Sequence, residues 1–249
     1  MFYLKPKIST FPYNYTCGAI DAIGRCDLKG YWTRESGIGV IIWDPRILVK
    51  VLDILRKRNI KPLAPMNNID ISELETKTHI IIVDKYVAEK IKKKPPFTRI
   101  LVIEREADID KVVEEAICLF YGKKTYNEVT LGLDPGPDYV AYALIVDGIL
   151  FESGKRDTNS IISYIINIIT TIPYKRFYIR IGSNLDGVEL AETIVSSING
   201  YGNVFVEIVD EYSTTKHALA ISEISKSHIR DKDIKAAINI SFKNGSRIS

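Results

Sequence analysis

Runs of hydrophobic residues alternate with helical patterns along the first half of the chain. Buried strands are predicted at residues 40–43 (VIIW), 79–84 (HIIIVD) and 99–104 (RILVIE). A helix is predicted to begin at Pro45, and another is predicted at 109–122. A Lys-rich helical segment is expected between the last two strands. Strands that are apolar on both faces and alternate with helices predict a mainly parallel sheet.

The pattern changes after the polar segment GKKTYNE (122–128). Three strands, VTLGLD, YVAYALIVDG and ILFESG, follow one another with turns at Pro135-Gly136 and Asp147-Gly148. Asp-Gly between apolar runs indicates a hairpin, so we expect these strands to be antiparallel. The elements predicted after them are a helix at 157–171, a strand at 175–182, a helix at 186–198, a strand at 203–210, a helical segment from 213 and a helix from about 231.

These patterns predict an α/β protein of two domains. Residues 1–127 are expected to form a basic α/β domain with a mainly parallel sheet, although the first 37 residues show no clear period. Residues 128–249 are expected to form a domain with a mixed sheet and the order βββαβαβα. Asp186 and Glu189 have the spacing of a capping box at the start of the helix over 186–198.

Composition and charge narrow the functional classes. The chain has 249 residues, 46% of them hydrophobic and 26% charged, values typical of globular proteins. Its start lacks the apolar core of a secretory signal, and its most hydrophobic run (161–172) is shorter than the roughly 18–20 residues that span a bilayer. Three cysteines without a C-x-x-C pair argue against a disulfide framework and a zinc ribbon. We therefore expect a cytoplasmic protein without a membrane segment.

The positive charge is concentrated in the first half. Residues 1–127 carry 22 Lys and Arg against 16 Asp and Glu, a net charge of +6, whereas residues 128–249 carry 12 against 15, a net charge of −3. Two basic runs supply candidate phosphate contacts, which are Arg56, Lys57, Arg58, Lys92, Lys93 and Lys94. The alternative is that both runs are solvated helix ends and loops.

Asp134 follows a short apolar strand and directly precedes Pro135-Gly136. One interpretation is that Asp134 only begins the turn, since aspartate bonds its own backbone and is common before Pro and Gly. The other is that the strand presents a carboxylate to a metal ion or a phosphate, with Gly136 allowing a ligand to approach the backbone. Further carboxylates in the same site would favour the second interpretation.

Four motifs resemble the RuvC/YqgF family of ribonuclease H-like, Holliday junction resolvase-like nucleases. They are LGLDPG (131–136), IGSNLDG (181–187), VDEYSTTKHA (209–218) and DIKAAINI (233–240). The resemblance covers only the C-terminal half and implies a ribonuclease H-like domain there. It implies catalytic carboxylates at Asp134, Glu211 and Asp233, with Asp210 as an adjacent metal ligand. Several carboxylates around Mg²⁺ or Mn²⁺ would activate water and neutralise a phosphate.

The resemblance leaves more than one function open. The leading hypothesis is a divalent-metal-dependent endonuclease that acts on a nucleic-acid partner, either a DNA junction or structured RNA. This hypothesis is also compatible with a homodimer. A non-catalytic scaffold that binds nucleic acid or a protein is the alternative, since Arg180 and Tyr212 depart from the family pattern. A sugar-kinase-like or actin-like ATPase also begins with a D-x-G turn, but Pro137 and Asp138 replace the hydroxyl residues usual there.

Overall fold

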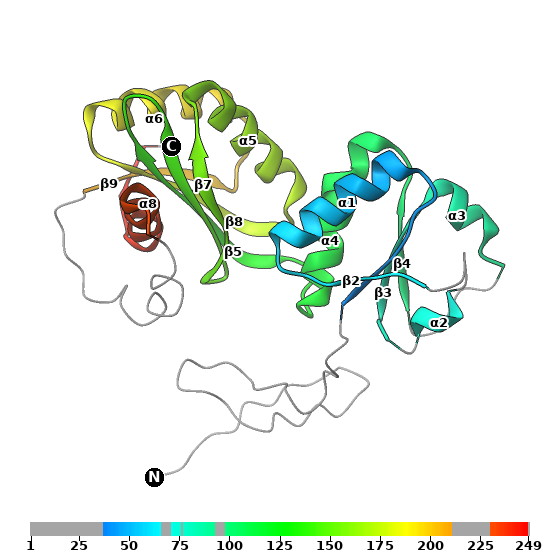
Figure 1. The fold of residues 1–249 in the computed structure, drawn as a ribbon. Helices are drawn as coiled ribbons and strands as arrows, with labels where there is room; N and C mark the ends of the chain where they lie inside the picture. Colours follow the sequence, from blue (N-terminus) through cyan, green and yellow to red (C-terminus); the bar gives the residue numbers. More distant parts are fainter. Residues whose placement is uncertain (1–36, 66–70, 76, 93–97, 211–229, 249) are drawn as a thin grey trace, which may run out of the picture. The chain divides into compact units, whose positions relative to one another are not determined.

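The computed structural model describes residues 37–65, 71–75, 77–92, 98–210 and 230–248 (Figure 1). Its first half contains a four-stranded sheet in the order β2-β1-β3-β4, in which every pair is parallel. The strands are β1 (Ile38–Ile41), β2 (Pro62–Leu63), β3 (Ile80–Asp84) and β4 (Arg99–Ile103). The prediction of a parallel sheet is therefore confirmed for this region.

Helices cover both faces of the four-stranded sheet, which explains why its strands are apolar throughout. Helices α1 (Pro45–Lys57) and α4 (Ile109–Phe120) share one core with Ile80 and Ile82 of β3. The other core contains Ile81 and Val83, together with residues of α2 (Ser72–Glu75) and α3 (Lys85–Lys90). The two-residue period of the strand thus sends alternate side chains to opposite cores.

Asp84, at the end of β3, is a buried carboxylate with a structural role. Its oxygens accept hydrogen bonds from the backbone N–H groups of Trp43, Asp44 and Val87 at 2.7, 3.0 and 2.9 Å. It therefore caps α3 and fixes the loop that leads into α1, where Asp44 in turn caps the helix that Pro45 begins. Backbone donors satisfy this strand-end carboxylate, so it needs no metal.

The second half contains a six-stranded mixed sheet in the order β10-β9-β8-β5-β6-β7. Its strands are β5 (Tyr126–Pro135), β6 (Val140–Val146), β7 (Ile149–Arg156), β8 (Tyr174–Gly182), β9 (Val204–Val209) and β10 (Ser246–Arg247). The pairs β5–β6, β6–β7 and β9–β10 are antiparallel, while β5–β8 and β8–β9 are parallel. This topology is consistent with a ribonuclease H-like fold.

The two faces of the six-stranded sheet differ in chemistry. Helices α5 (Thr158–Thr171) and α6 (Leu185–Ser197) cover one face, and α8 (Lys232–Phe242) lies on the other (Figure 1). The first face packs large apolar side chains such as Leu131, Leu133 and Ile179. Beneath α8 the sheet presents Ala141 and Ala143, which pack with Ala237 and Ile238 of the helix.

Some local details differ from the sequence-based expectations. Asn184, and not the expected pair Asp186 and Glu189, caps α6 by accepting a hydrogen bond from the backbone N–H of Gly187 at 2.7 Å. The short strands β2 and β10 and the helix α2 were not expected, because two to four residues carry too little pattern. The helical segment expected from residue 213 lies outside the described residues.

One buried side chain connects elements of the two sheets. Residues 36–249 belong to one compact unit that contains both sheets, so a division at residues 127 and 128 stays a prediction. Within this unit Arg58 donates hydrogen bonds to Glu114 of α4 and to Glu152 of β7, each at 2.7 Å.

No helix in the described ranges is both long enough and apolar enough to cross a membrane.

Candidate functional site

Asp134 lies in β5 itself, one residue before the strand ends. It pairs with Ala141 of β6 in the ladder. The turn closes beyond it, where Gly136 N–H donates to the carbonyl of Tyr139 at 3.0 Å. The neighbouring Pro135 carbonyl accepts a hydrogen bond from the side chain of Asn184 at 2.9 Å, which ties the end of β5 to the start of α6. Asp134 is thus held by the regular strand and is half-buried.

The face on which Asp134 lies follows from Gly132, two residues earlier. A Cβ atom at Gly132 would stand 2.2 Å from the carbonyl oxygen of Ala237 in α8, so only glycine lets the helix approach this closely. Residues two apart in a strand point to the same face. Asp134 therefore faces the side of the sheet that carries α8.

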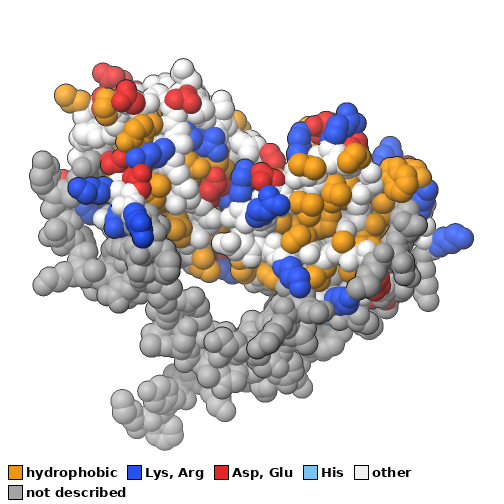
Figure 2. Space-filling model, in the orientation of Figure 1, with side chains coloured by type: hydrophobic (Ala, Val, Ile, Leu, Met, Phe, Trp, Pro, Cys, Tyr) orange, Lys and Arg blue, Asp and Glu red, His pale blue; other side chains and the backbone are white. Residues whose placement is uncertain are grey.

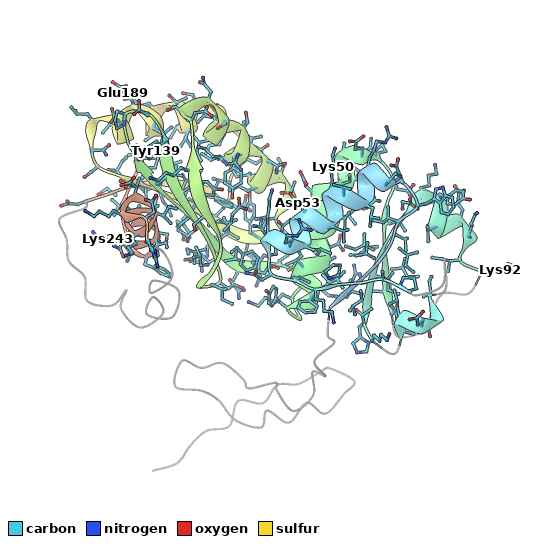
Figure 3. All side chains as sticks on the ribbon, in the orientation of Figure 1. Lys50, Asp53, Lys92, Tyr139, Glu189 and Lys243 are labelled. Carbon is cyan, nitrogen blue, oxygen red and sulfur yellow. The ribbon has the colours of Figure 1, made fainter. Side chains whose placement is uncertain are left out.

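A second group of charged residues lies at the first turn of α8. The Asp231 side chain caps the helix by accepting from the backbone N–H groups of Asp233 and Ile234 at 3.0 and 3.4 Å. The Asp233 carboxylate accepts from the Tyr139 hydroxyl at 2.9 Å and from the Lys155 ammonium at 2.7 Å. Lys155 is also 2.9 Å from Asp231. Figure 3 labels Tyr139 beside α8.

These contacts stabilise the charged forms of all three ionisable groups. The hydrogen bond with Lys155 lowers the pKa of Asp233, and the Tyr139 hydroxyl lowers it further. Lys155 likewise holds the pKa of Asp231 below its usual value. In return the two carboxylates raise the pKa of Lys155, mainly through the bond to Asp233. The group is therefore an ion-paired cluster at neutral pH, and in Figure 2 acidic and basic side chains stand beside each other around α8.

The strand register brings Asp134 and this cluster to the same end of the same sheet face. Asp134 pairs with Ala141, and Ala141 pairs with Lys155 of β7, so the three residues form one row across three strands. Paired residues in neighbouring strands point to the same side. Asp233 reaches this row through its bond to Lys155. Two of the predicted carboxylates, Asp134 and Asp233, therefore belong to one region.

The remaining predicted ligands are less well defined. Glu211 lies outside the described residues. Asp210 is exposed directly after β9, and its backbone carbonyl accepts a hydrogen bond from Lys243 at 3.2 Å. No three His, Cys, Asp or Glu side chains in the described ranges gather closely enough to hold a metal ion. The described residues alone therefore do not form a metal site, and a site that also includes Glu211 stays a prediction.

Arg180, one of the two residues that depart from the family pattern, has a structural role on β8. Its guanidinium is buried and donates to Glu207 of β9 at 2.9 Å and to the carbonyl of Ser241 at 2.7 Å. It therefore fastens the last turn of α8 to the two strands beneath it. Sequence reasoning placed Arg180 on this strand but did not find Glu207 as its partner.

Sequence reasoning also missed Lys155 and Tyr139, which contact Asp233. Lys155 could have been found only from the register of the β6–β7 hairpin, because it is 78 residues away from Asp233 in sequence. Tyr139 follows the turn after Asp134, and in the sequence it is indistinguishable from a strand-packing tyrosine.

The predicted basic runs differ in accessibility. Lys92 is exposed beyond the end of α3, as Figure 3 shows, while Lys93 and Lys94 lie outside the described residues. Arg56 and Lys57 are exposed at the end of α1, where both approach Asp53. Arg58 is different, because its side chain is only 7% exposed and pairs with two glutamates. We therefore exclude Arg58 from the candidate phosphate-binding surface.

Comparisons with known proteins add little. No protein family model matches the sequence, and no curated protein matches it. The structure resembles that of RuvC from T. thermophilus in complex with a Holliday junction substrate, with a TM-score of 0.33 and 11% sequence identity. This match covers 46% of the present chain and 90% of the RuvC chain. A similarity of this size is too weak to assign a family or a function.

Proposed function

We propose that the protein is a divalent-metal-dependent nuclease whose active site lies at the end of β5, beside the first turn of α8. The observation that carries the proposal is the close contact of α8 with β5 at Gly132. Asp134 lies two residues beyond Gly132 in the strand, and Asp233 lies one helical turn before Ala237 in the helix. The close contact through small residues therefore supports the proposal that these two carboxylates, which are far apart in the sequence, lie near each other.

The proposed chemistry is hydrolysis of a phosphodiester. Water adds to phosphorus, the bond from phosphorus to the leaving oxygen breaks, and that oxygen takes up a proton. A bound Mg²⁺ or Mn²⁺ would lower the pKa of the attacking water and neutralise phosphate charge. In this proposal Asp134, Asp233 and Glu211 hold the cation, and Asp210 is a neighbouring candidate.

The proposal is tested by Asp134→Asn, which keeps the size of the side chain and removes its charge. Cleavage of a DNA four-way junction, a DNA flap, single-stranded DNA and structured RNA should be measured with Mg²⁺ and with Mn²⁺. We expect wild type to cleave at least one substrate and Asp134→Asn to lose that activity. The matched control is Glu192→Gln, an exposed carboxylate on α6 across the sheet, which should cleave like wild type.

A non-catalytic scaffold that binds nucleic acid is the second candidate. The ion pairs of Asp233 with Lys155 and of Arg180 with Glu207 favour it, because each satisfies a charged group without a metal. Tight binding by wild type without cleavage in either metal would support this candidate over the nuclease.

The basic half is tested separately by changing Lys92, Lys93 and Lys94 to alanine. If these residues contact phosphates, affinity should fall and the salt dependence should flatten by roughly one counterion per lost contact. Binding equal to that of wild type across a salt series would mean that this run is only a solvated surface. The matched control is Lys175→Ala, a charge change on β8 of the other sheet.

A further inference from the structure

Two aromatic side chains are exposed side by side at the carboxyl end of the four-stranded parallel sheet. Trp43, which follows β1, is 63% exposed, and Tyr86 in the first turn of α3 is 40% exposed. Their ring centroids are 5.2 Å apart, with 35° between the ring planes. The Lys90 ammonium lies 3.8 Å from the Tyr86 ring centre and 6.0 Å from the Trp43 ring centre. The two rings and the lysine therefore form a candidate contact surface.

One buried carboxylate holds both aromatic residues in place. Asp84, at the end of β3, accepts hydrogen bonds from the backbone N–H of Trp43 at 2.7 Å and from that of Val87 at 2.9 Å. The loop that carries Trp43 and the helix that carries Tyr86 are thus tied to the same strand end. A surface that is fixed before binding loses little conformational entropy when a partner binds to it.

The aromatic pair lies where the strand order of the sheet reverses. From β1 the chain passes to β2 on one side, and β3 lies on the other side of β1. Helices α1 and α3, which follow β1 and β3, pack on opposite faces of the sheet and begin at the same end of it (Figure 1). Open α/β sheets bind ligands outside the carboxyl ends of the strands at such a switch point. The topology thus places Trp43 and Tyr86 at the ligand-binding end of this sheet.

This end of the sheet carries a net positive charge. Residues 85–94 contain five lysines and one glutamate, a net charge of +4. Three nearby acidic residues are neutralised in the ion pairs Asp44–Arg46, Glu106–Lys50 and Asp108–Arg105. Asp84 and Glu104 remain, and subtracting their two charges from +4 leaves +2. Flat aromatic rings beside lysines suit a partner that has planar rings and negative charges.

We propose that Trp43 and Tyr86 form a stacking surface for the bases of a single-stranded nucleic acid, whose phosphates contact Lys90 and the lysines that follow it. Unpaired bases stack on aromatic side chains with little regard to sequence, while basic residues bind the backbone. In a duplex the bases are already stacked on one another, so their faces are not available to the rings. This surface belongs to the other sheet from the proposed nuclease site and needs no metal, so the inference does not rest on that proposal.

Binding of labelled oligo(dT) and oligo(U) to the full chain in EDTA tests the proposal. Trp43→Ala should weaken binding about tenfold because one base loses its stacking partner, whereas Trp43→Phe should stay within about threefold of wild type. The salt dependence should be unchanged in Trp43→Ala and should fall by roughly one counterion in Lys90→Gln. Tyr201→Ala, which removes an exposed aromatic side chain near the start of β9, is the matched control and should bind like wild type.

The fluorescence of Trp43 gives a direct readout of stacking. The sequence has two tryptophans, so Trp43 is the remaining one in Trp32→Phe. We expect single strands to quench its emission to saturation, with oligo(dT) and oligo(U) alike because both offer bases and phosphates. A duplex of the same length should bind at least about tenfold more weakly.

Equal affinity for duplex and single strand, or binding without quenching, would overturn the stacking proposal. Self-association of the wild-type chain that disappears in Trp43→Ala would assign the surface to a second copy of the chain instead. Absence of binding by wild type would also overturn this inference. None of these results decides whether the chain cleaves nucleic acid with a divalent metal, so the two proposals fail separately.

Discussion

The two faces of the six-stranded sheet are built on different principles. The face under α5 and α6 is filled by large apolar side chains, including Leu131 and Leu133, which are fully buried. The face under α8 has Gly132, which lies between these two leucines in β5, and Ala141 in the neighbouring strand β6. Large side chains bury area and keep a helix at a distance, whereas small ones let its backbone approach the strand. We infer that one face supplies stability and the other positions charged groups.

The largest loss of stability is expected from a substitution on the apolar face. Leu131→Ala should lower the free energy of unfolding by about 2–5 kcal/mol, because it removes buried methyl groups and leaves a cavity. Urea denaturation measures this loss. Mn²⁺ affinity should not change at temperatures where the variant is folded. A large loss of Mn²⁺ affinity in the folded variant would contradict the separation of the two faces.

The next effect is expected where α8 contacts β5. Gly132→Ala should cost about 1–3 kcal/mol of stability, because the new methyl group would overlap the Ala237 carbonyl and force the helix outward. Unlike Leu131→Ala, it should also weaken Mn²⁺ binding by moving Asp233. Gly202→Ala is the matched control, since a Cβ there meets nothing within 4 Å. Unchanged Mn²⁺ affinity in Gly132→Ala would break the link between close packing and the site.

A smaller effect is expected at the cap of α6, on the apolar side. Asn184→Ala should cost about 0.5–2 kcal/mol, since it leaves the backbone N–H of Gly187 without its side-chain acceptor. Asp186→Asn should change stability much less, because Asp186 is not the capping residue. Thermal unfolding of both variants checks this order. Equal losses of stability would support the capping box that the sequence predicted.

The smallest change in stability is expected from the ion pairs of Lys155 with Asp231 and Asp233, and it should depend on pH. The folded-state pKa values of Asp231 and Asp233 lie below the usual 3.8, so their ion pairs stabilise the protein above that pH and are lost as the carboxylates become protonated below it. Lys155→Met should therefore be slightly less stable than wild type at pH 7. The difference should shrink as the pH falls below about 3.8. Urea unfolding at pH 7 and pH 3 measures it, and a constant difference would show that Lys155 acts by packing.

The pattern of the sequence determined most of the elements. Its alternation of apolar runs and helical repeats predicted the parallel sheet, the Asp147-Gly148 hairpin turn and the helix that follows Asp231. Both turn residues have positive φ, 46° and 84°, which agrees with an Asp-Gly hairpin. These features depend on neighbours within a few positions, so local patterns are sufficient to reveal them. The position of Asp134 at the end of its strand belongs to the same class.

Only the tertiary structure decided which residues surround Asp233. Between β6 and β7 the register shifts by one residue, from Ile145 paired with Leu150 to Leu144 paired with Glu152. Without that bulge Ala141 would face Gly154, and Lys155 would point to the apolar side of the sheet. A one-residue shift has no signal in the hydrophobic pattern of these strands. The sequence thus determined that Asp134 ends a strand, whereas long-range register and the contact of α8 at Gly132 decided which charges share its face.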